Sequence, residues 1–351
     1  MNWKSTITTS VASLALASCT LAFAQATPAA KAPAQKPAAP VLTSPGPQIT
    51  NLNPFPPVNS KFFTSDLVTV ETVNAFLKQL WGYDPNRLWQ VAAIQKTEAP
   101  GVTKVVVYVA EKGGAAKTTG TQFFITPDGK HAIADAVIPF GATPFADARK
   151  TLEAHADGPA RGAASKDLLL VEFSDMQCPH CKEAQTTMDQ LVKDFPGARV
   201  VFQNYPLVDI HAASFKAAAY GVCVAKQSND AFFQYAQAVF ETQEALTPEN
   251  TDLTLKNAVT RAGQNPAAVA ECAETQAVKD NVNASIKLAE GLNVTSTPTL
   301  YVNGRSLPIT SIPYETLKQI ISFQALQDGV NTGAVAAPMV APSAAKAPSL
   351  K

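Results

Sequence analysis

The sequence has no excess of either charge and few of the residues that hold metals. Lysine plus arginine and aspartate plus glutamate each number 28 in 351 residues, so the formal net charge is zero. Nothing in this balance predicts nucleic acid or an anionic membrane surface as a partner. The five cysteines and four histidines form only one Cys-x-x-Cys and no histidine pair at ligand spacing, which excludes a structural zinc site. No motif predicts a nucleotide or a flavin, so we expect no cofactor besides the cysteines themselves.

Long hydrophobic runs are also missing. The apolar stretch at residues 11–24 is too short to span a bilayer as a mature helix. It follows Lys4 and ends in Ala22-Phe23-Ala24, which fits a cleavage site, so residues 1–24 are predicted to be a signal peptide. A lipoprotein signal is the alternative, because Leu16-Ala17-Ser18-Cys19 places Cys19 where a lipid is attached. Apolar residues continue past Cys19, which favours ordinary cleavage. Both alternatives predict export to the periplasm or another extracytoplasmic, disulfide-permissive compartment.

Two segments have too few large apolar residues to fold. Residues 25–60 and residues 329–351 share a composition rich in alanine and proline. Such segments cannot bury enough surface to offset the entropy lost on ordering. We therefore predict a disordered, semi-extended tether at residues 25–60 and a disordered tail at residues 329–351.

Residues 61–142 are predicted to form a small α+β domain. Its helix is expected to begin near a cap at Ser65-Asp66 and to bury one apolar face, formed by Val70, Val73, Phe76, Leu77, Leu80 and Trp81. Four stretches rich in Val, Ile and Phe then predict antiparallel strands, at residues 89–96, 103–109, 121–126 and 131–137. Pro127-Asp128-Gly129-Lys130 is a turn signal between the last two.

The one Cys-x-x-Cys pair lies at a junction between a strand and a helix. Residues 167–173 are a short apolar run typical of a buried strand. From Cys178 onward the apolar residues recur at helical spacing, so Cys178 lies at a helix N-terminus and Cys181 about one turn inside the helix. Five cysteines can produce this spacing by chance, but the change from strand to helix at this point favours a redox pair.

This placement has chemical consequences for both sulfurs. A helix N-terminus stabilises negative charge, and a thiolate attacks disulfides whereas a thiol does not. Cys178 is therefore the predicted nucleophile with a lowered pKa, and Cys181 is the predicted resolving thiol. Pro179 suits the first helical turn. His180 is expected to add positive charge or a hydrogen bond to the Cys178 thiolate, which makes the disulfide a stronger oxidant.

Two motifs resemble the DsbA-like branch of the thioredoxin superfamily, a family of thiol:disulfide oxidoreductases. The first is Glu172-Phe173-Ser174-Asp175 followed by Cys178-Pro179-His180-Cys181, and the second is Ser296-Thr297-Pro298-Thr299 before a strand and an Asn-Gly turn. The resemblance covers residues 161–327 and implies a cis peptide at Thr297-Pro298, packed against the cysteines. It also implies that Glu172 is a buried carboxyl that exchanges a proton with Cys181. The alternative for Glu172 is a strand residue that faces solvent.

The expected fold is an α/β thioredoxin-like fold with a helical insertion, preceded by a small α+β (cystatin-like) domain. The thioredoxin-like domain covers residues 161–328 and its helical insert residues 211–290, where His211 opens the insert without an assigned role. Residues 143–160 are predicted to be a connecting helix, or else a helix folded onto the redox domain. The hairpin around the turn at residues 127–130 resembles the amino-terminal dimerisation domain of the disulfide isomerases DsbC and DsbG.

Cys223 and Cys272 lie on two predicted helices of the insert. One interpretation is that both are small buried apolar residues. An oxidising compartment, together with the cysteines that related proteins often carry at these places, favours a structural disulfide between them.

The predicted function is an exported protein thiol:disulfide oxidoreductase that acts through Cys178-Pro179-His180-Cys181. Its expected partners are protein substrates with cysteine thiols and a redox partner that regenerates the active-site disulfide. The Pro-His pair between the cysteines favours an oxidase. One alternative is a disulfide isomerase or reductase that forms a homodimer through residues 61–142. Another is a thioredoxin-fold module that binds without catalysis.

Overall fold

The computed structural model describes residues 53–113 and 117–330. The predicted signal peptide, the lipoprotein motif at Cys19, most of the tether and almost all of the tail lie outside these residues. Within the described part of the chain, no helix combines the length and the apolar character needed to cross a membrane.

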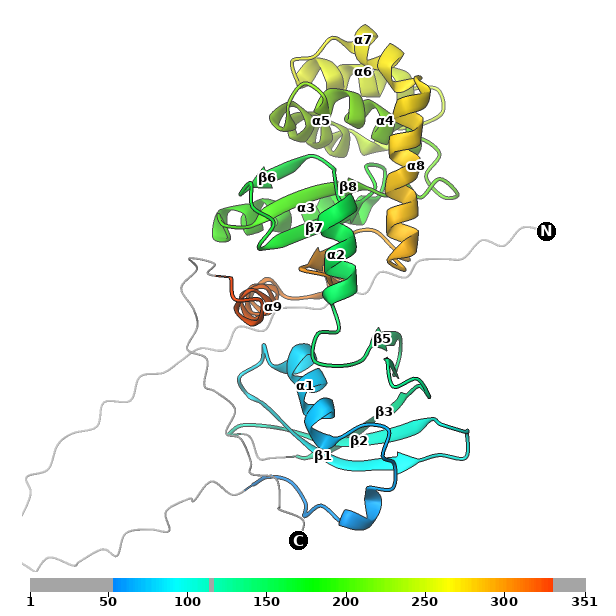
Figure 1. Cartoon of the computed structure of the whole chain (residues 1–351). Helices are drawn as coiled ribbons and strands as arrows, with labels where there is room; N and C mark the ends of the chain where they lie inside the picture. Colours follow the sequence, from blue (N-terminus) through cyan, green and yellow to red (C-terminus); the bar gives the residue numbers. More distant parts are fainter. Residues whose placement is uncertain (1–52, 114–116, 331–351) are drawn as a thin grey trace, which may run out of the picture. The chain divides into compact units, whose positions relative to one another are not determined.

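The first folded unit packs one helix on an antiparallel sheet (Figure 1). Helix α1 spans Val70–Trp81 and buries Val73, Phe76 and Leu77 against the apolar face of the sheet. The strands follow one another in the order β1-β2-β3-β4-β5, with bounds Arg87–Lys96, Thr103–Glu111, Thr119–Ile125, His131–Ile133 and Val137–Pro139. This is the α+β arrangement that the sequence predicts.

Two details of this unit differ from the sequence prediction. The cap of α1 is Thr69, whose hydroxyl accepts a hydrogen bond from the Thr72 amide, while the hydroxyl of Ser65 bonds Thr103 instead. The predicted strand at residues 131–137 is two short strands, β4 and β5, which pair with each other. The chain reverses between them, where Ala134 donates to the carbonyl of Ala136, so the segment cannot continue as one strand.

The second sheet has the strand order β10-β9-β7-β8-β6 and holds the redox motif. Strands β7 and β8 are parallel and flank helix α3, whereas β9 and β6 pair antiparallel to this central pair. The bounds are β6 Ala160–Gly162, β7 Leu169–Ser174, α3 Pro179–Asp194, β8 Arg199–Asn204, β9 Thr299–Val302 and β10 Arg305–Leu307. A parallel strand–helix–strand unit beside an antiparallel strand is the mixed α/β architecture expected from the sequence.

Helices cover both faces of this sheet, so the central strand is buried throughout. Side chains alternate along β7: Leu170 contributes to the core beneath α3 and α9 (Tyr314–Gln327), and Val171 to the core on the opposite face. That opposite core includes Leu152 of α2 (Ala146–His155) and Ala289 of α8 (Gln276–Gly291). Helix α2 is thus folded onto the redox domain, which decides between the two alternatives that the sequence left open.

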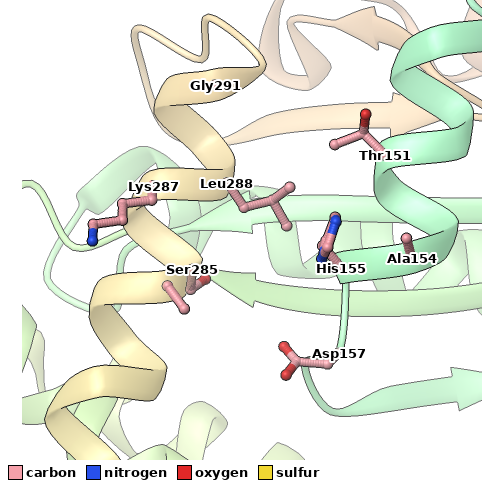
Figure 2. A pocket seen from close by; sticks show the side chains of 9 residues that line it. Thr151, Ala154, His155, Asp157, Ser285, Lys287, Leu288 and Gly291 are labelled. Carbon is pink, nitrogen blue, oxygen red and sulfur yellow. The ribbon is translucent and has the colours of Figure 1, made fainter.

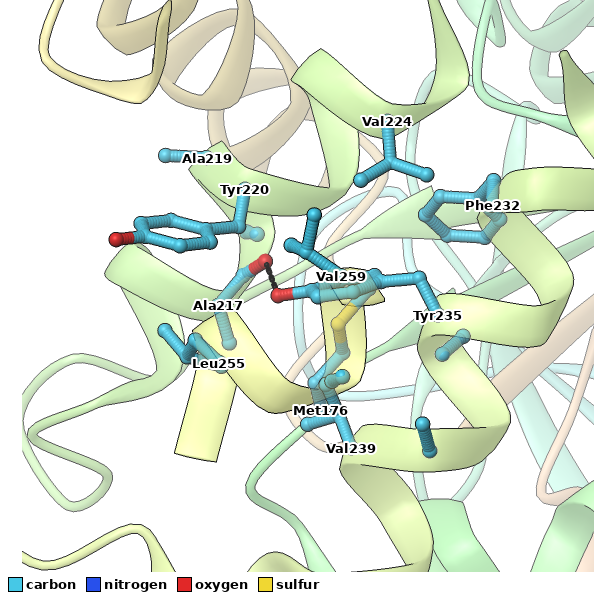
Figure 3. Packing of buried hydrophobic residues seen from close by; sticks show 14 of the residues in the cluster. Met176, Ala217, Ala219, Tyr220, Val224, Phe232, Tyr235, Val239, Leu255 and Val259 are labelled. Atoms are coloured by element: carbon cyan, nitrogen blue, oxygen red, sulfur yellow. Dashed lines mark hydrogen bonds between the residues drawn. The ribbon is translucent and has the colours of Figure 1, made fainter. Parts of the chain in front are cut away.

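The helical insert forms its own apolar core next to the redox pair. Its helices are α4 Ser214–Ala225, α5 Asn229–Glu241, α6 Thr251–Arg261, α7 Pro266–Ala273 and α8, with a short 3-10 turn at Gln243–Ala245 between α5 and α6. A second short 3-10 turn, at Ile309–Ser311, lies outside the insert. Figure 3 shows Tyr235 of α5 inside this core, where its hydroxyl donates to the carbonyl of Ala217 at 2.8 Å. Cys223 of α4 and Cys272 of α7 form a disulfide, which confirms the structural pairing and rules out two free buried thiols.

Candidate active site

The two redox cysteines lie at the start of α3, directly after β7. Cys178 is the N-cap residue with extended backbone, Pro179 is the first helical residue, and Cys181 lies one turn further on. Proline fits this position because the first helical N–H groups have no partner within the helix. Both thiols are free; Cys178 is 5% exposed and Cys181 is fully buried. The outer sulfur is thus the one that a substrate reaches first.

The environment separates the acidities of the two thiols. The thiol of Cys181 hydrogen-bonds the sulfur of Cys178 and lowers its pKa to about 5, against the opposing effect of burial, and the backbone amides of Cys181 and His180 add to the lowering. Burial raises the pKa of Cys181, and the neighbouring Cys178 raises it further. Such a pair holds one stable thiolate and one neutral thiol at neutral pH.

His180 contributes a hydrogen bond to the Cys178 thiolate through its backbone rather than its ring. Its ring is 70% exposed and lies 3.0 Å from the carboxylate of Glu183, and this hydrogen bond is the main reason that the pKa of His180 is raised. The contribution of His180 to the Cys178 thiolate comes first from its backbone N–H. An exposed ring paired with an exposed carboxylate at the surface gives a weak, solvent-screened interaction.

The second motif meets the first one in space. The Thr297-Pro298 peptide bond is cis, and the carbonyl oxygen of Thr297 lies 3.5 Å from the sulfur of Cys178. The two motifs that the sequence singles out are therefore brought together in a buried contact, although more than a hundred residues separate them in the chain.

Glu172 is buried beneath the cysteines rather than facing solvent. It lies on β7, is 2% exposed, and accepts a hydrogen bond of 3.0 Å from the amide group of Gln185. Burial raises its pKa to about 7, although hydrogen bonds to the carboxyl partly counteract the burial. The solvent-facing alternative is therefore wrong, and a carboxyl with this pKa can give or take a proton near neutral pH.

The insert holds the loop that leads into Cys178. Gln243 donates to the carbonyls of Met176 and Cys178 at 2.9 and 3.0 Å, and Gln177 donates to the carbonyl of Leu246 at 3.2 Å. Figure 3 shows Met176 among the apolar residues of the insert core. Sequence reasoning missed these glutamines, because a polar residue in or beside a helix carries no sign that it points inward.

Two cavities lie away from the sulfurs. One of about 420 Å³ lies between α2 and α8, where Figure 2 shows Leu288 pointing toward α2 and His155 at the end of that helix. Another of about 330 Å³ is lined by Gln185, Arg161 and Asp189, so it reaches the amide that contacts Glu172. Among residues 53–113 and 117–330, no three histidine, cysteine or acidic side chains are placed to hold a metal ion.

Comparison with known proteins shows what this domain is similar to. Residues 155–322 match the family described as Thioredoxin. Disulfide bond formation protein D of Bacillus subtilis is 25% identical over 167 residues, which cover 46% of this chain and 75% of that protein. A probable disulfide bond formation protein D of Bacillus anthracis is 27% identical, over 43% of this chain and 71% of that protein.

The chain is also similar to part of some larger proteins and to several solved structures. Na(+)/H(+) antiporter NhaA 3 of Salinispora tropica is 26% identical over 41% of this chain, but the match spans only 21% of the antiporter's length. Among solved structures, the catalytic domain of Proteus mirabilis ScsC is 21% identical with a TM-score of 0.43, over 51% of this chain and 98% of that one. BdbD from Bacillus subtilis is 24% identical with a TM-score of 0.43, over 48% and 93%.

The family match, the mixed sheet and the Cys178–Cys181 site at the start of α3 agree with one another. Residues 155–322 thus match the thioredoxin family, and the chain is similar over this domain to disulfide bond formation proteins of the DsbA-like kind.

Proposed function

We propose that the protein is an exported thiol:disulfide oxidoreductase that acts as an oxidase on protein thiols. The observation that carries this proposal is the contrast between the two sulfurs: the pKa of Cys178 is lowered to about 5, while that of the buried Cys181 is raised. A stable Cys178 thiolate favours the reduced form of the pair, so the disulfide form is a strong oxidant.

The reaction transfers one disulfide to the substrate. A substrate thiolate attacks the sulfur of Cys178, the Cys178–Cys181 bond breaks, and Cys181 keeps the electron pair. A second substrate thiolate then attacks the substrate sulfur of this mixed disulfide, and Cys178 leaves as a thiolate. The substrate gains a disulfide and loses two electrons, which remain on the two cysteines until a redox partner removes them.

Glu172 supplies the proton that the buried sulfur needs. When Cys181 leaves as a thiolate, it is enclosed and its pKa is raised, so it must be neutralised. The carboxyl of Glu172 has a pKa of about 7 and is the buried acid beneath the pair. It therefore donates a proton in this step and recovers it when the pair is reoxidised.

The backbone at Thr297 and Pro298 positions the substrate. The Thr297 carbonyl lies beside the sulfur of Cys178. An extended substrate segment that pairs with this backbone would align its cysteine with Cys178, as in strand addition.

Export is supported by the disulfide between Cys223 and Cys272, because such a bond persists in oxidising compartments. The proposal includes the signal at residues 1–24 and its lipoprotein alternative at Cys19. It also includes two domains, residues 61–142 and 161–328, of which the first is a spacer or a docking surface.

The rival proposal is an isomerase that dimerises through residues 61–142. The exposed apolar side chains of that domain favour it, since Val137 is 63% and Phe62 48% exposed. An isomerase must be kept reduced, however, whereas the lowered pKa of Cys178 favours donation of the disulfide.

One experiment separates the alternatives. The purified protein is equilibrated with glutathione buffers, and its redox potential and its mass in solution are measured. A potential near about −120 mV with a monomer supports the oxidase, and a potential near about −180 mV or lower, with a dimer that deletion of residues 61–142 abolishes, overturns it. Cys178→Ser tests catalysis itself: an enzyme loses thiol exchange entirely, whereas a binding module keeps its affinity for unfolded chains.

A further inference from the structure

A buried carboxylate that the proposed reaction does not use lies three residues before Cys178. The side chain of Asp175 has no exposed surface. One of its oxygens accepts a hydrogen bond of 2.7 Å from the amide of Gln177. The other accepts from the amide of Leu207 at 2.7 Å and from the ring of His211 at 2.8 Å. Since a buried charge is costly unless it is fully hydrogen-bonded, this set of donors fixes where Asp175 lies.

The main chain of the same residue contacts both cysteines. The amide of Asp175 donates to the sulfur of Cys181 at 3.3 Å, and its carbonyl accepts from the amide of Cys178 at 3.1 Å. The side chain of Asp175 therefore anchors a peptide unit whose N–H points at the buried sulfur.

The anchor comes from a distant part of the chain. Leu207 and His211 belong to the segment that joins β8 to α4, the start of the helical insert. The Asp175–His211 pair thus ties the redox loop to the insert at the point where the leaving sulfur of the reaction lies.

We propose that the amide of Asp175 stabilises the Cys181 thiolate as it leaves, and that His211 is the positioning residue that aims this amide through the Asp175 carboxylate. The proposal rests on the proposed oxidoreductase function. As the substrate thiolate bonds to Cys178, the electron pair of the breaking bond moves to Cys181, where the N–H of Asp175 already points. A donor fixed in advance at a developing anion lowers the barrier without reorganisation. Glu172 then donates the proton that neutralises the Cys181 thiolate.

The tautomer of His211 follows from its partner. An ionised carboxylate only accepts hydrogen bonds, so the Nδ1 atom that faces Asp175 carries a proton. Asparagine can place an N–H donor near the position of Nδ1, glutamine places it one bond further away, and alanine removes it. The variants His211→Asn, His211→Gln and His211→Ala therefore form a graded series.

The test measures how fast reduced glutathione attacks the oxidised full chain, by rapid quenching and alkylation of free thiols. His211→Ala should slow this attack by about tenfold to a hundredfold, and His211→Asn should stay within about threefold of the parent chain. His155→Ala is the matched control, because His155 lines the cavity between α2 and α8, and it should leave the rate unchanged. A merely structural role of His211 would lower the unfolding free energy but would leave the rate of the folded protein unchanged.

The outcomes that overturn the inference are specific. One is a folded His211→Ala variant that reacts within about twofold of the parent. Another is a His211→Asn variant that is as slow as His211→Ala. If the alanine variant does not fold, the comparison passes to His211→Gln against His211→Asn, and equal rates for these two overturn the inference. If the parent chain itself does not exchange with glutathione, the proposed function fails instead, which keeps the two failures distinct.

Discussion

Gln185 donates a hydrogen bond of 3.0 Å to the carboxyl of Glu172. The same amide group donates to the carbonyl of Cys181, also at 3.0 Å. The buried acid is therefore linked through one side chain to the helical turn that carries the resolving cysteine, and Gln185 also lines a cavity.

Replacing Glu172 with glutamine should change how stability depends on pH. The carboxyl has an ordinary pKa of 4.5, and burial raises the pKa in the folded protein to about 7. Below the lower value it is neutral in both states. As the pH rises from 4.5 to about 7, the carboxyl ionises in the unfolded state but not in the folded state. The parent therefore loses up to about 3 kcal/mol of unfolding free energy across this range. Glu172→Gln has no such loss.

Urea unfolding at about pH 4 and about pH 8 measures this difference. Glu172→Gln should be more stable than the parent at about pH 8 but not at about pH 4. Glu183→Gln, at a carboxyl 67% exposed, is the control that should show no comparable change. An equal effect of Glu172→Gln at both pH values would contradict the raised pKa.

Cys181 should control the acidity of Cys178. Its thiol hydrogen bond is the largest cause of the lowered pKa of Cys178. Cys181→Ala removes the donor and should raise that pKa by at least about one unit, whereas Cys181→Ser keeps a donor and should raise it less. Thiolate absorbance against pH gives the midpoint, expected at about 5 in the parent. Equal midpoints in the two variants would show that the hydrogen bond is not the cause.

Removal of the His180 ring should matter less than removal of the Cys181 thiol. The ring is 70% exposed and paired with Glu183, and His180→Ala keeps the backbone N–H that contributes to the lowered pKa of Cys178. We expect a rise in this pKa of about half a unit. The same absorbance titration measures it. A rise as large as that of Cys181→Ala would show that the ring itself stabilises the thiolate.

Loss of the disulfide in the insert should lower the unfolding free energy and leave thiol exchange at Cys178 intact. Cys223 and Cys272 are 49 residues apart in the chain, so their bond restricts a sizeable loop of the unfolded state. The double change to alanine should cost about 2–4 kcal/mol in urea unfolding. Glutathione exchange at Cys178 should persist under native conditions. Mass mapping of the unreduced parent checks the pairing, and two alkylatable thiols there would contradict it.

The sequence predicts those parts of the redox site that depend only on neighbouring residues in the chain. A strand followed by proline in a first helical turn places Cys178 at the start of α3 without knowledge of the fold. The cis peptide before Pro298 and the burial of Glu172 follow from the family resemblance. These features depend on short motifs, which can be recognised in the sequence without a structure.

The remaining parts of the site depend on contacts across the chain. Asp175 and His211 are 36 residues apart, and neither residue's local pattern indicates that they meet. The cap of α1 shows the same limit, because Ser65 and Thr69 are both good caps. Ser65 is used instead to bond Thr103, 38 residues away, a choice that only the tertiary structure makes.

Gln243 donates hydrogen bonds to the carbonyls of Met176 and Cys178. These bonds limit how much of the helical insert can be removed from this domain. Excising the insert to leave a bare thioredoxin fold would remove the side chain that donates to both carbonyls and the apolar residues that surround Met176. The catalytic loop would then have to find a new conformation. A shortened version of this domain would therefore need a redesigned support for the loop, and not merely a shorter connection from β8 to β9.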